Sequence, residues 1–227
     1  MLTVKTNLKL LTTDQQFTTR LLQSYRSALI KRFHNPRFMR HVEETTMFTL
    51  YESIKRTDTY ASMLQFDGQL RVELGVADSD TVMESLITDW VNSISVRLRQ
   101  PRIVGGQLRG ALLEIQGVQA DYRDVLSQGY ASYVTKPKSD KQPVVIPWLE
   151  WLLTKGTEIL VLSHIPFSPP KYVTKASRTQ SNVIMRKTKG QGWGVPVEFA
   201  GTTEGNFITE AIDKAMPVIH KRLIRSL

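Results

Sequence analysis

The stretch that decides the fold runs from residue 144 to residue 215. It opens with IPWLEWLLTKG (residues 146–156), in which a proline and two tryptophans mark the start of a short amphipathic helix. A basic segment at residues 171–189 follows, and GQGWGVPVEF (residues 190–199) comes next as a glycine-flanked strand. NFITEAI (residues 206–212) begins a terminal helix. This order predicts a docking module, so we expect an assembly component rather than an enzyme.

The composition of the whole chain is that of a globular protein. At 227 residues it fits one large domain or two small ones. It is 41% hydrophobic and 22% charged, which disfavours intrinsic disorder. No apolar run approaches the roughly 18 residues that a membrane span needs, and the N-terminal MLTVK lacks the apolar core of a signal peptide. The absence of cysteine excludes disulfides and thiolate metal sites, and it suits a reducing cytoplasm.

The net charge of +9 is unevenly distributed along the chain. Residues 1–56 hold ten Lys and Arg against four acids, residues 57–133 hold six against ten, and residues 134–199 hold ten against four. Two basic segments on either side of an acidic one suggest complementary surfaces on identical copies, or contact with a polyanion. For any single cluster, a solvated charged face is the alternative.

Two helices are predicted at the N-terminus. Thr13-Asp14 is a favourable start, because a short oxygen-bearing side chain accepts hydrogen bonds from the free N–H groups of the first turn. An apolar stripe then extends to about Phe33, and Asn35-Pro36 ends the helix, because the residue before a proline is pushed out of the helical region. A second helix is expected over residues 36–55, so the pair predicts a helical hairpin.

Residues 62–74 switch to a period of two around Asp67-Gly68. Because glycine accepts the positive φ of a tight turn, this pattern predicts a β-hairpin, with an irregular loop as the alternative. Asp78-Ser79-Asp80 then caps a helix that we expect to reach Leu98.

Short strands and turns are expected in the middle of the chain. Glycines between apolar runs predict strands with tight connections over residues 102–120. Residues 134–143 are rich in Lys and Pro, which indicates an exposed segment, and residues 159–162 form a β-type run.

The last third of the chain combines an extended segment with a helix. Three prolines between residues 166 and 170 require an extended or turning backbone. Residues 171–189 are basic with few large apolar side chains, so we expect either a flexible arm or a long hairpin that projects into solvent. The final helix is expected over residues 207–224, with a kink at Pro217.

Together these elements predict an α+β fold. It would contain an N-terminal helical hairpin, a further helix, a small mostly antiparallel sheet with a long basic loop, and a C-terminal helix. We expect a single domain over residues 1–227. Within it, the hairpin occupies residues 1–56, a core occupies 57–215 with an extended arm at 166–190, and the last helix occupies 206–227.

The histidines do not have the spacing of a metal site. A zinc-protease helix places two histidines four residues apart so that both imidazoles face one ion. His34 and His41 are seven residues apart with a proline between them, so their side chains are not preset to converge. We interpret them, with His164 and His220, as loop or surface residues.

Common catalytic and phosphate-binding motifs are also missing. There is no Gly-x-Ser-x-Gly elbow, Gly105-Gly106 has no lysine for a phosphate loop, and residues 190–192 lack a third glycine. Asp78-Ser79-Asp80 lacks the central glycine and terminal glutamate of a calcium loop, so a helix cap is the favoured interpretation. We therefore predict no catalytic residue, no metal and no cofactor.

Trp148 and Trp151 share one face of their helix and allow two interpretations. Core packing is the ordinary role of two such large apolar groups. Contact with a partner is the alternative, since tryptophan is enriched at interface hot spots and Pro147 marks a helix N-terminus.

The basic segment at 171–189 can contact phosphates. Tyr172 is the aromatic residue among its bases, which is poor for stacking on single strands. A solvated loop, or one ordered by the acidic face of a neighbouring subunit, is favoured over sequence-specific DNA reading. The bases concerned are Lys171, Lys175, Arg178, Arg186, Lys187 and Lys189.

Several short segments between residues 60 and 215 carry a family resemblance. They are LRVELGV (70–76), ITDWVNSI (87–94), DYRDVL (121–126), PWLEWLL (147–153), SRT (177–179) and WGVPVEFAGT (193–202). These segments resemble virion structural proteins of large contractile-tailed phages. The final layout is also similar to the tail-completion family, the neck proteins that join head to tail, in which a Trp-containing element, a loop and an aromatic-Ile segment precede the last helix.

This resemblance implies a tail-completion-like α+β subunit of a neck ring with sixfold or twelvefold symmetry. It also implies other neck, portal or tail proteins as partners, genomic DNA in the channel, no membrane, and a location in the virion after synthesis in the bacterial cytoplasm. The two N-terminal helices differ from the single long helix that is usual in short tail-completion proteins.

The leading hypothesis is therefore a structural, non-enzymatic subunit that joins head to tail by oligomerisation. Its acidic residues 57–133 would pair with the basic arm of a neighbour, and charge complementarity would fix the register. The expected interface residues are Trp148, Trp151, Trp193 and the six bases of the arm named above.

The alternative is a double-stranded DNA-binding module that uses the N-terminal helices. Phosphate contacts of this kind lose affinity steeply with salt. The expected contact residues are Arg20, Arg26, Lys31, Arg32, Arg37 and Arg40. The two hypotheses are compatible if these helices line a DNA channel.

Overall fold

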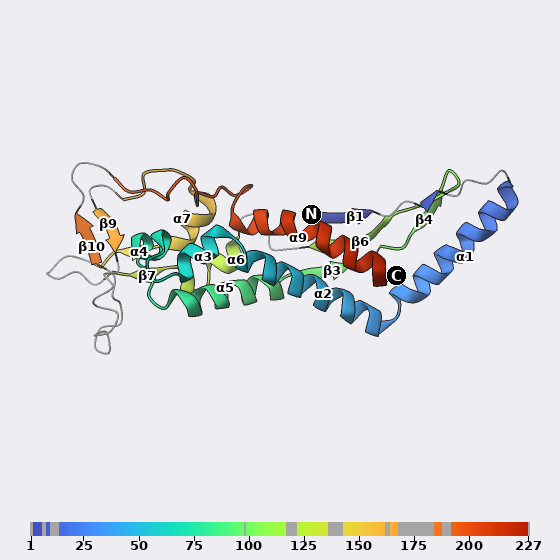
Figure 1. The fold of residues 1–227 in the computed structure, drawn as a ribbon, viewed down its shortest axis with the longest axis horizontal. Coiled ribbons are helices and arrows are strands. Elements are labelled where there is room, and N and C mark those ends of the chain that lie inside the picture. The colour runs from blue at the N-terminus through green and yellow to red at the C-terminus, as the bar shows by residue number, and fades with distance from the viewer. Residues whose placement is uncertain are drawn as a thin grey trace. The chain divides into compact units, whose positions relative to one another are not determined.

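The helices and strands form an α+β fold, which confirms the fold class expected from the sequence (Figure 1). All of the strand pairs in the described part of the chain are antiparallel. None of the described helices has a stretch long and apolar enough to cross a membrane. The computed structural model describes residues 2–5, 8–9, 14–97, 99–116, 122–135, 143–161, 164–167, 184–187 and 192–226.

The chain divides into two compact units, and each is assembled from segments that are far apart in the sequence. Unit 1 comprises Met1–Leu50, Val91–Gly117 and Ala215–Leu227. Unit 2 comprises Tyr51–Trp90 and Val118–Lys214. The predicted segments 1–56, 57–215 and 206–227 do not coincide with these units, and the single domain over 1–227 stays a prediction.

Unit 1 begins with helices whose starts are set by polar caps. α1 (Gln15–Phe33) follows Asp14, whose carboxylate accepts hydrogen bonds from two N–H groups of the first turn at 2.9 Å. α2 (Pro36–Lys55) begins at the expected proline, and the side-chain oxygen of Asn35 accepts from an N–H of its first turn at 3.0 Å. Both N-terminal helices are therefore confirmed.

These two helices do not close into the expected hairpin. They diverge from their connection, where the rings of Phe33 and Phe38 stack with centroids 6.1 Å apart (Figure 1). α1 lies beside β4 (Arg102–Val104) and β5 (Gln107–Arg109) rather than along α2. The buried residues of α1 are Leu22 and Phe33. The sequence pattern did not predict that this helix packs against β4 and β5.

The strands of unit 1 form two three-stranded sheets, with the orders β1-β6-β3 and β2-β5-β4. Gly105 and Gly106 connect β4 to β5 with φ values of 58° and 68°, which a two-residue hairpin turn requires. The strands expected over 102–120 are thus confirmed as far as the described residue 116. The remaining members are β1 (Leu2–Lys5), β2 (Leu8–Lys9), β3 (Ser95–Arg97) and β6 (Ala111–Gln116).

The helix expected to reach Leu98 ends earlier, so that prediction is wrong. α5 (Ser79–Asn92) starts in the predicted place but stops at Asn92, and β3 follows and pairs with β6. In β3, Val96 is buried between exposed Ser95 and Arg97. The apolar residues 94, 96 and 98 repeat with a period of two, which is the spacing of a strand and not of a helix.

Unit 2 replaces the predicted hairpin at residues 62–74 with two short helices, which corrects that expectation. α3 (Asp58–Leu64) is capped by Thr57, and α4 (Gln69–Leu74) is preceded by Gly68. Gly68 is extended rather than left-handed, and a Cβ there would collide with the carbonyl oxygen of Ser62. The glycine is therefore needed for a close approach of two helices and not for a tight strand turn.

The rest of unit 2 consists of short elements around α7 (Trp148–Thr154). The β-type run at 159–162 appears as a bridge between Val161 and Trp193. In the region of the expected arm, β9 and β10 pair as an antiparallel ladder, which favours the hairpin alternative; residues 168–183 and 188–191 lie outside the described residues. The elements are α6 (Arg123–Leu126), a 3-10 turn η1 (Gly129–Ala131), β7 (Tyr133–Val134), β8 (Val145–Ile146), β9 (His164–Phe167) and β10 (Ile184–Lys187).

The last helix, α9 (Phe207–Ser226), confirms the predicted C-terminal helix and contains Pro217. Its bend at the proline stays a prediction. Of the Lys- and Pro-rich segment 134–143, residues 136–142 lie outside the described residues, while Val134 and Val144 are exposed.

Candidate nucleic-acid interface

The tryptophans of unit 2 lie in its core. Trp148 is fully buried and donates from Nε1 to the carbonyl oxygen of Tyr130 at 2.7 Å. Trp151 and Trp193 are 8% and 6% exposed, and their ring centroids are 5.7 Å apart. Trp193 also donates from Nε1 to Glu73 at 2.8 Å. These contacts support the packing interpretation of the tryptophans, since their side chains are used inside unit 2.

Asn206 organises the start of α9 within the same core. Its side-chain oxygen accepts from the N–H groups of Ile208 and Thr209 at 3.0 and 3.2 Å, as a helix cap does. Its side-chain nitrogen donates to the hydroxyl of Tyr122 at 2.8 Å and to two backbone carbonyls. The Asn206 side chain, which is 7% exposed, thus connects the start of α9 to α7 and to Tyr122, the residue before α6.

A half-buried polar cluster joins α2 to α5 inside unit 2. Lys55 and Tyr60 contact the carboxylate of Glu84 at 2.7 and 2.6 Å, and the hydroxyl of Tyr51 donates to it as well. Burial by itself raises the pKa of Glu84, but the hydrogen bonds from Lys55, Tyr51 and Tyr60 outweigh it and lower that pKa to about 2. Burial and the Glu84 carboxylate raise the pKa of Tyr60 to about 12. These contacts join the end of α2 to α3 and α5.

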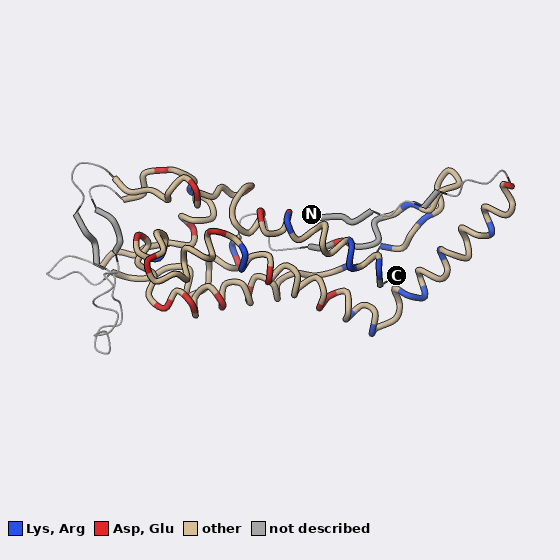
Figure 2. The backbone as a smooth tube through the Cα atoms, viewed as in Figure 1, with Lys and Arg blue, Asp and Glu red and all other residues tan. Residues whose placement is uncertain are grey.

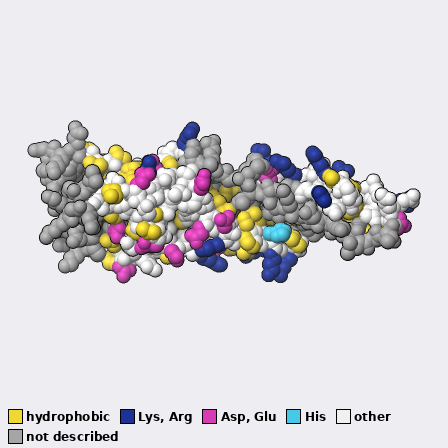
Figure 3. All heavy atoms as spheres, turned by 90° about the horizontal axis from the view of Figure 1, so that it is seen from above, with side chains coloured by type: hydrophobic (Ala, Val, Ile, Leu, Met, Phe, Trp, Pro, Cys, Tyr) yellow, Lys and Arg dark blue, Asp and Glu magenta, His cyan; other side chains and the backbone are white. Residues whose placement is uncertain are grey.

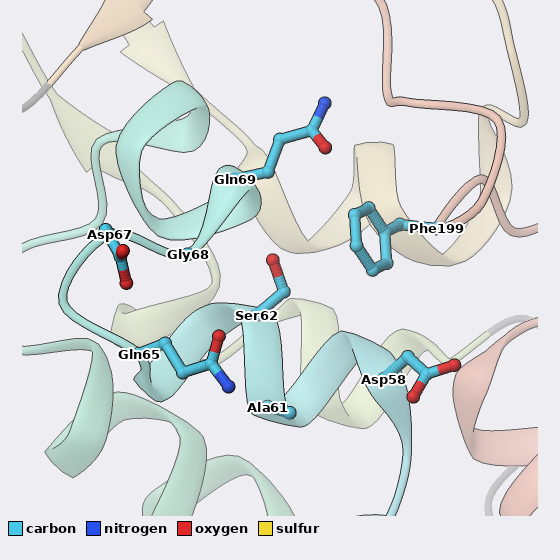
Figure 4. A pocket seen from close by; sticks show the side chains of 8 residues that line it. All are labelled: Asp58, Ala61, Ser62, Gln65, Asp67, Gly68, Gln69 and Phe199. Carbon is cyan, nitrogen blue, oxygen red and sulfur yellow. The ribbon is translucent and has the colours of Figure 1, made fainter.

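An open pocket lies between α3 and α4 in unit 2 (Figure 4). The ring of Phe199 and the hydroxyl of Ser62 point into the same space, with the carboxylates of Asp58 and Asp67 at its margins. The Ser62 hydroxyl oxygen accepts from the N–H of Leu70 at 3.0 Å. No group of His, Asp or Glu with the arrangement of a metal site occurs among the described residues. We call this hollow the α3–α4 pocket.

Unit 1 differs from unit 2 in its charge. It holds fifteen Lys and Arg against four acids, whereas unit 2 holds fifteen against seventeen. Figure 2 shows the basic residues of unit 1 along α1 and around β4. In the space-filling view, acidic side chains gather over the elements of unit 2 and basic ones over those of unit 1 (Figure 3).

All of the basic side chains described in unit 1 are exposed, and we call them the unit 1 basic set. Six of them were expected from the sequence as DNA contacts, and the other seven come from β3 to β5 and from the end of α9. The members are Arg20, Arg26, Lys31, Arg32, Arg37, Arg40, Arg97, Arg99, Arg102, Arg109, Lys221, Arg222 and Arg225.

The two units also differ in how their charges are paired. In unit 2, most of the basic side chains that the structure describes form ion pairs with carboxylates, among them Lys55 with Glu84 and Lys214 with Glu210. In unit 1, Arg99 forms a two-point pair with buried Glu114 at 2.7 and 3.1 Å. Among the described residues, no ion pair is found for Arg20, Lys31, Arg37, Arg40, Arg97, Arg102, Lys221 or Arg225.

The β4–β5 hairpin concentrates this positive charge at one place. Arg102 and Arg109 are direct partners in its ladder, so two exposed guanidinium groups stand on the same face of adjacent strands. Like charges placed opposite each other destabilise a sheet. Arg26 of α1 donates from Nε to the carbonyl oxygen of Pro101 at 3.1 Å, which brings a third guanidinium beside the hairpin. An anion bound between these groups would relieve their repulsion.

Of the site residues expected in the arm, Lys171, Lys175, Arg178 and Lys189 lie outside the described residues. Arg186 and Lys187 are in β10. The acidic partner surface expected at 57–133 is interrupted, because residues 97–109 hold four arginines and no acid and belong to unit 1. That local run of arginines was the signal that could have revealed the hairpin as part of the basic surface.

No family model, no curated protein and no solved structure matches this chain.

Proposed function

We propose that this chain is a structural subunit of a phage virion neck ring and that its unit 1 contacts the phosphate backbone of double-stranded DNA. The observation that carries the DNA part is the Arg102–Arg109 pair within the exposed unit 1 basic set. The family resemblance carries the assembly part.

The chemistry of the basic set favours phosphate as its partner. Guanidinium groups donate in a planar fork that fits two phosphate oxygens, and this set contains eleven arginines and two lysines. Contacts to phosphate position a protein on DNA without reading its sequence. This suits a subunit past which DNA of any sequence travels.

Unit 2 supplies the rigid body of the proposed subunit. The segments that resemble neck proteins and that the structure describes lie largely in this unit, in α4, α5, α6 and α7 and at residues 193–202. Within it, Trp193 donates to Glu73 and so joins residues 193–202 to α4. Asn206 donates to the hydroxyl of Tyr122 and to the carbonyl oxygen of Leu153, which joins the residue before α6 to α7.

Particle imaging tests the assembly part. Electron cryomicroscopy of virions made by a phage that encodes this chain should place the chain in a closed ring between head and tail. Mass spectrometry of gradient-purified particles should find it in a constant ratio to the portal protein. Particles that contain no copy of this chain would contradict the proposal.

A stand-alone double-stranded DNA-binding module is the second candidate, since the same basic set serves either function. Native mass spectrometry of the purified chain separates the two. A neck subunit forms oligomers of defined size, whereas a stand-alone module binds DNA as a monomer and is absent from particles.

A further inference from the structure

α1 carries two apolar lines, and one of them faces solvent. Leu22 and Phe33 are buried in unit 1. On a neighbouring side, Phe17 is 56% exposed and Tyr25 is 49% exposed. With Leu21 and Ala28 they follow helical spacing, so the four form a continuous stripe, which we call the α1 stripe. Two large exposed aromatic side chains on one helix face are typical of a contact surface.

Positive charge borders this stripe. Arg20 and Lys31 are exposed, and no hydrogen bond or ion pair joins either side chain to another described residue. Arg20 lies roughly 120° around the helix from Arg26, because successive helical residues are about 100° apart. Arg26 is the residue bonded to Pro101, so Arg20 lies on a different side of α1 from the residue that contacts the β4–β5 hairpin.

Unit 2 has a surface of matching chemistry at the α3–α4 pocket. Phe66 is 59% exposed and stands next to Asp67, an exposed carboxylate for which no partner is found among the described residues. Asp67 and Asp58 lie at the margins of the pocket, and the ring of Phe199 forms part of its wall (Figure 4). A carboxylate pairs with the planar fork of a guanidinium group, so the exposed Asp67 suits an arginine of a partner, and the aromatic rings suit its apolar neighbours.

We propose that the α1 stripe of one copy of this chain docks on the α3–α4 pocket of a second copy, with Arg20 paired to Asp67 at the margin of the pocket. Charge complementarity identifies the partner, because unit 1 has fifteen bases to four acids and unit 2 has seventeen acids to fifteen bases. The apolar residues Phe17 and Phe66 would be covered in the same contact. The proposal rests on the ring assembly proposed above and names the surfaces that form it. The contact joins different surfaces on the two copies, so it builds rings or filaments.

Sedimentation velocity of the full-length chain over a range of concentrations tests this contact. We expect the wild type to form oligomers, and Arg20→Glu and Asp67→Lys each to raise the apparent dissociation constant at least tenfold. The double variant Arg20→Glu/Asp67→Lys restores an opposite-charge pair and should regain most of the wild-type affinity. Arg37→Glu and Glu204→Lys change the same charges at other exposed positions of units 1 and 2, and they should leave assembly within about twofold of the wild type.

The contact is overturned if the wild type stays monomeric, if the control variants weaken assembly as much as Arg20→Glu does, or if the double variant is no better than the single ones. Rescue by the double variant supports it, because a general loss of folding cannot be reversed by a second charge change. A failure of the neck proposal can be distinguished from a failure of this contact. A chain that assembles through this contact but is absent from virions keeps the contact and loses the neck function.

Discussion

The two units differ in how many of their basic side chains are paired with carboxylates. Unit 2 joins most of its described bases to carboxylates and encloses tryptophans, whereas unit 1 leaves a set of exposed bases with few carboxylates near them. Paired charges keep a structure fixed, while an excess of one sign raises the electrostatic energy of the isolated protein and is relieved by a counter-charge. This difference supports the proposal that unit 1, rather than unit 2, contacts a polyanion.

The largest effect is expected from the core of unit 2. Trp148→Ala removes a fully buried indole and leaves the carbonyl oxygen of Tyr130 without its donor, so unfolding should become easier by about 3–5 kcal/mol. Urea denaturation followed by circular dichroism measures this. The matched change in unit 1 is Phe48→Ala, whose ring is 58% exposed and whose loss should cost under about 0.5 kcal/mol. Similar costs for the two variants would remove the distinction between rigid body and contact surface.

A somewhat smaller effect is expected at the start of α9. Asn206→Ala deletes the helix cap and the donor to Tyr122, so it should destabilise the protein by about 2–4 kcal/mol. The same denaturation experiment measures it, with the exposed neighbour Thr203→Ala as the control. A loss below about 1 kcal/mol would mean that solvent already satisfies these groups and that this part of unit 2 is not rigid.

The Glu84 cluster predicts a pH dependence. The folded-state pKa of Glu84 is lowered to about 2 from an ordinary 4.5, so its stabilisation is present above pH 4.5 and is lost as the pH falls towards 2. Because the side chain is 41% exposed, solvent screening limits the contribution to about 1 kcal/mol. Glu84→Gln should therefore be less stable than the wild type at pH 6 and equal to it near pH 2. An equal difference at both pH values would assign the effect to packing instead of charge.

The smallest effect on stability is expected in the basic set. Arg37→Gln/Arg40→Gln removes two exposed charges without a described carboxylate partner, so the free energy of unfolding should change by less than about 0.5 kcal/mol and in the direction of greater stability. Thermal unfolding at low salt measures it. A clear destabilisation would show that these arginines support the fold of unit 1, which weakens the case that they are kept for a partner.

Local signals allowed the sequence to predict much of the fold. Asp14 and Asn35-Pro36 mark real helix boundaries because capping depends on neighbouring residues. The predicted hairpin around Gly68 was wrong because this glycine allows a close approach between α3 and α4. The order of residues along the chain does not show such an approach. The predicted end of α5 was wrong because the apolar residues 94 and 98 also fit a helical spacing, although this segment forms β3.

The candidate site was predicted only in part for a similar reason. Blocks of charge counted along the chain placed Arg97, Arg102 and Arg109 in an acidic segment. The chain path brings them into the same unit as the N-terminal arginines, so the basic surface depends on contacts between residues that are distant in the sequence. The tryptophans allowed two interpretations because one amphipathic helix suits both a core and an interface, and burial distinguishes them.

The salt dependence of binding to double-stranded DNA of mixed sequence tests the central claim most directly. Each phosphate contact contributes about 0.9 to the slope of log affinity against log salt concentration. Arg102→Gln/Arg109→Gln in unit 1 should therefore make the slope shallower by about 2, while Arg56→Gln/Lys155→Gln in unit 2 should leave it unchanged, since both residues are in ion pairs. A wild-type affinity that does not vary with salt, or an equal change in both variants, would contradict the account.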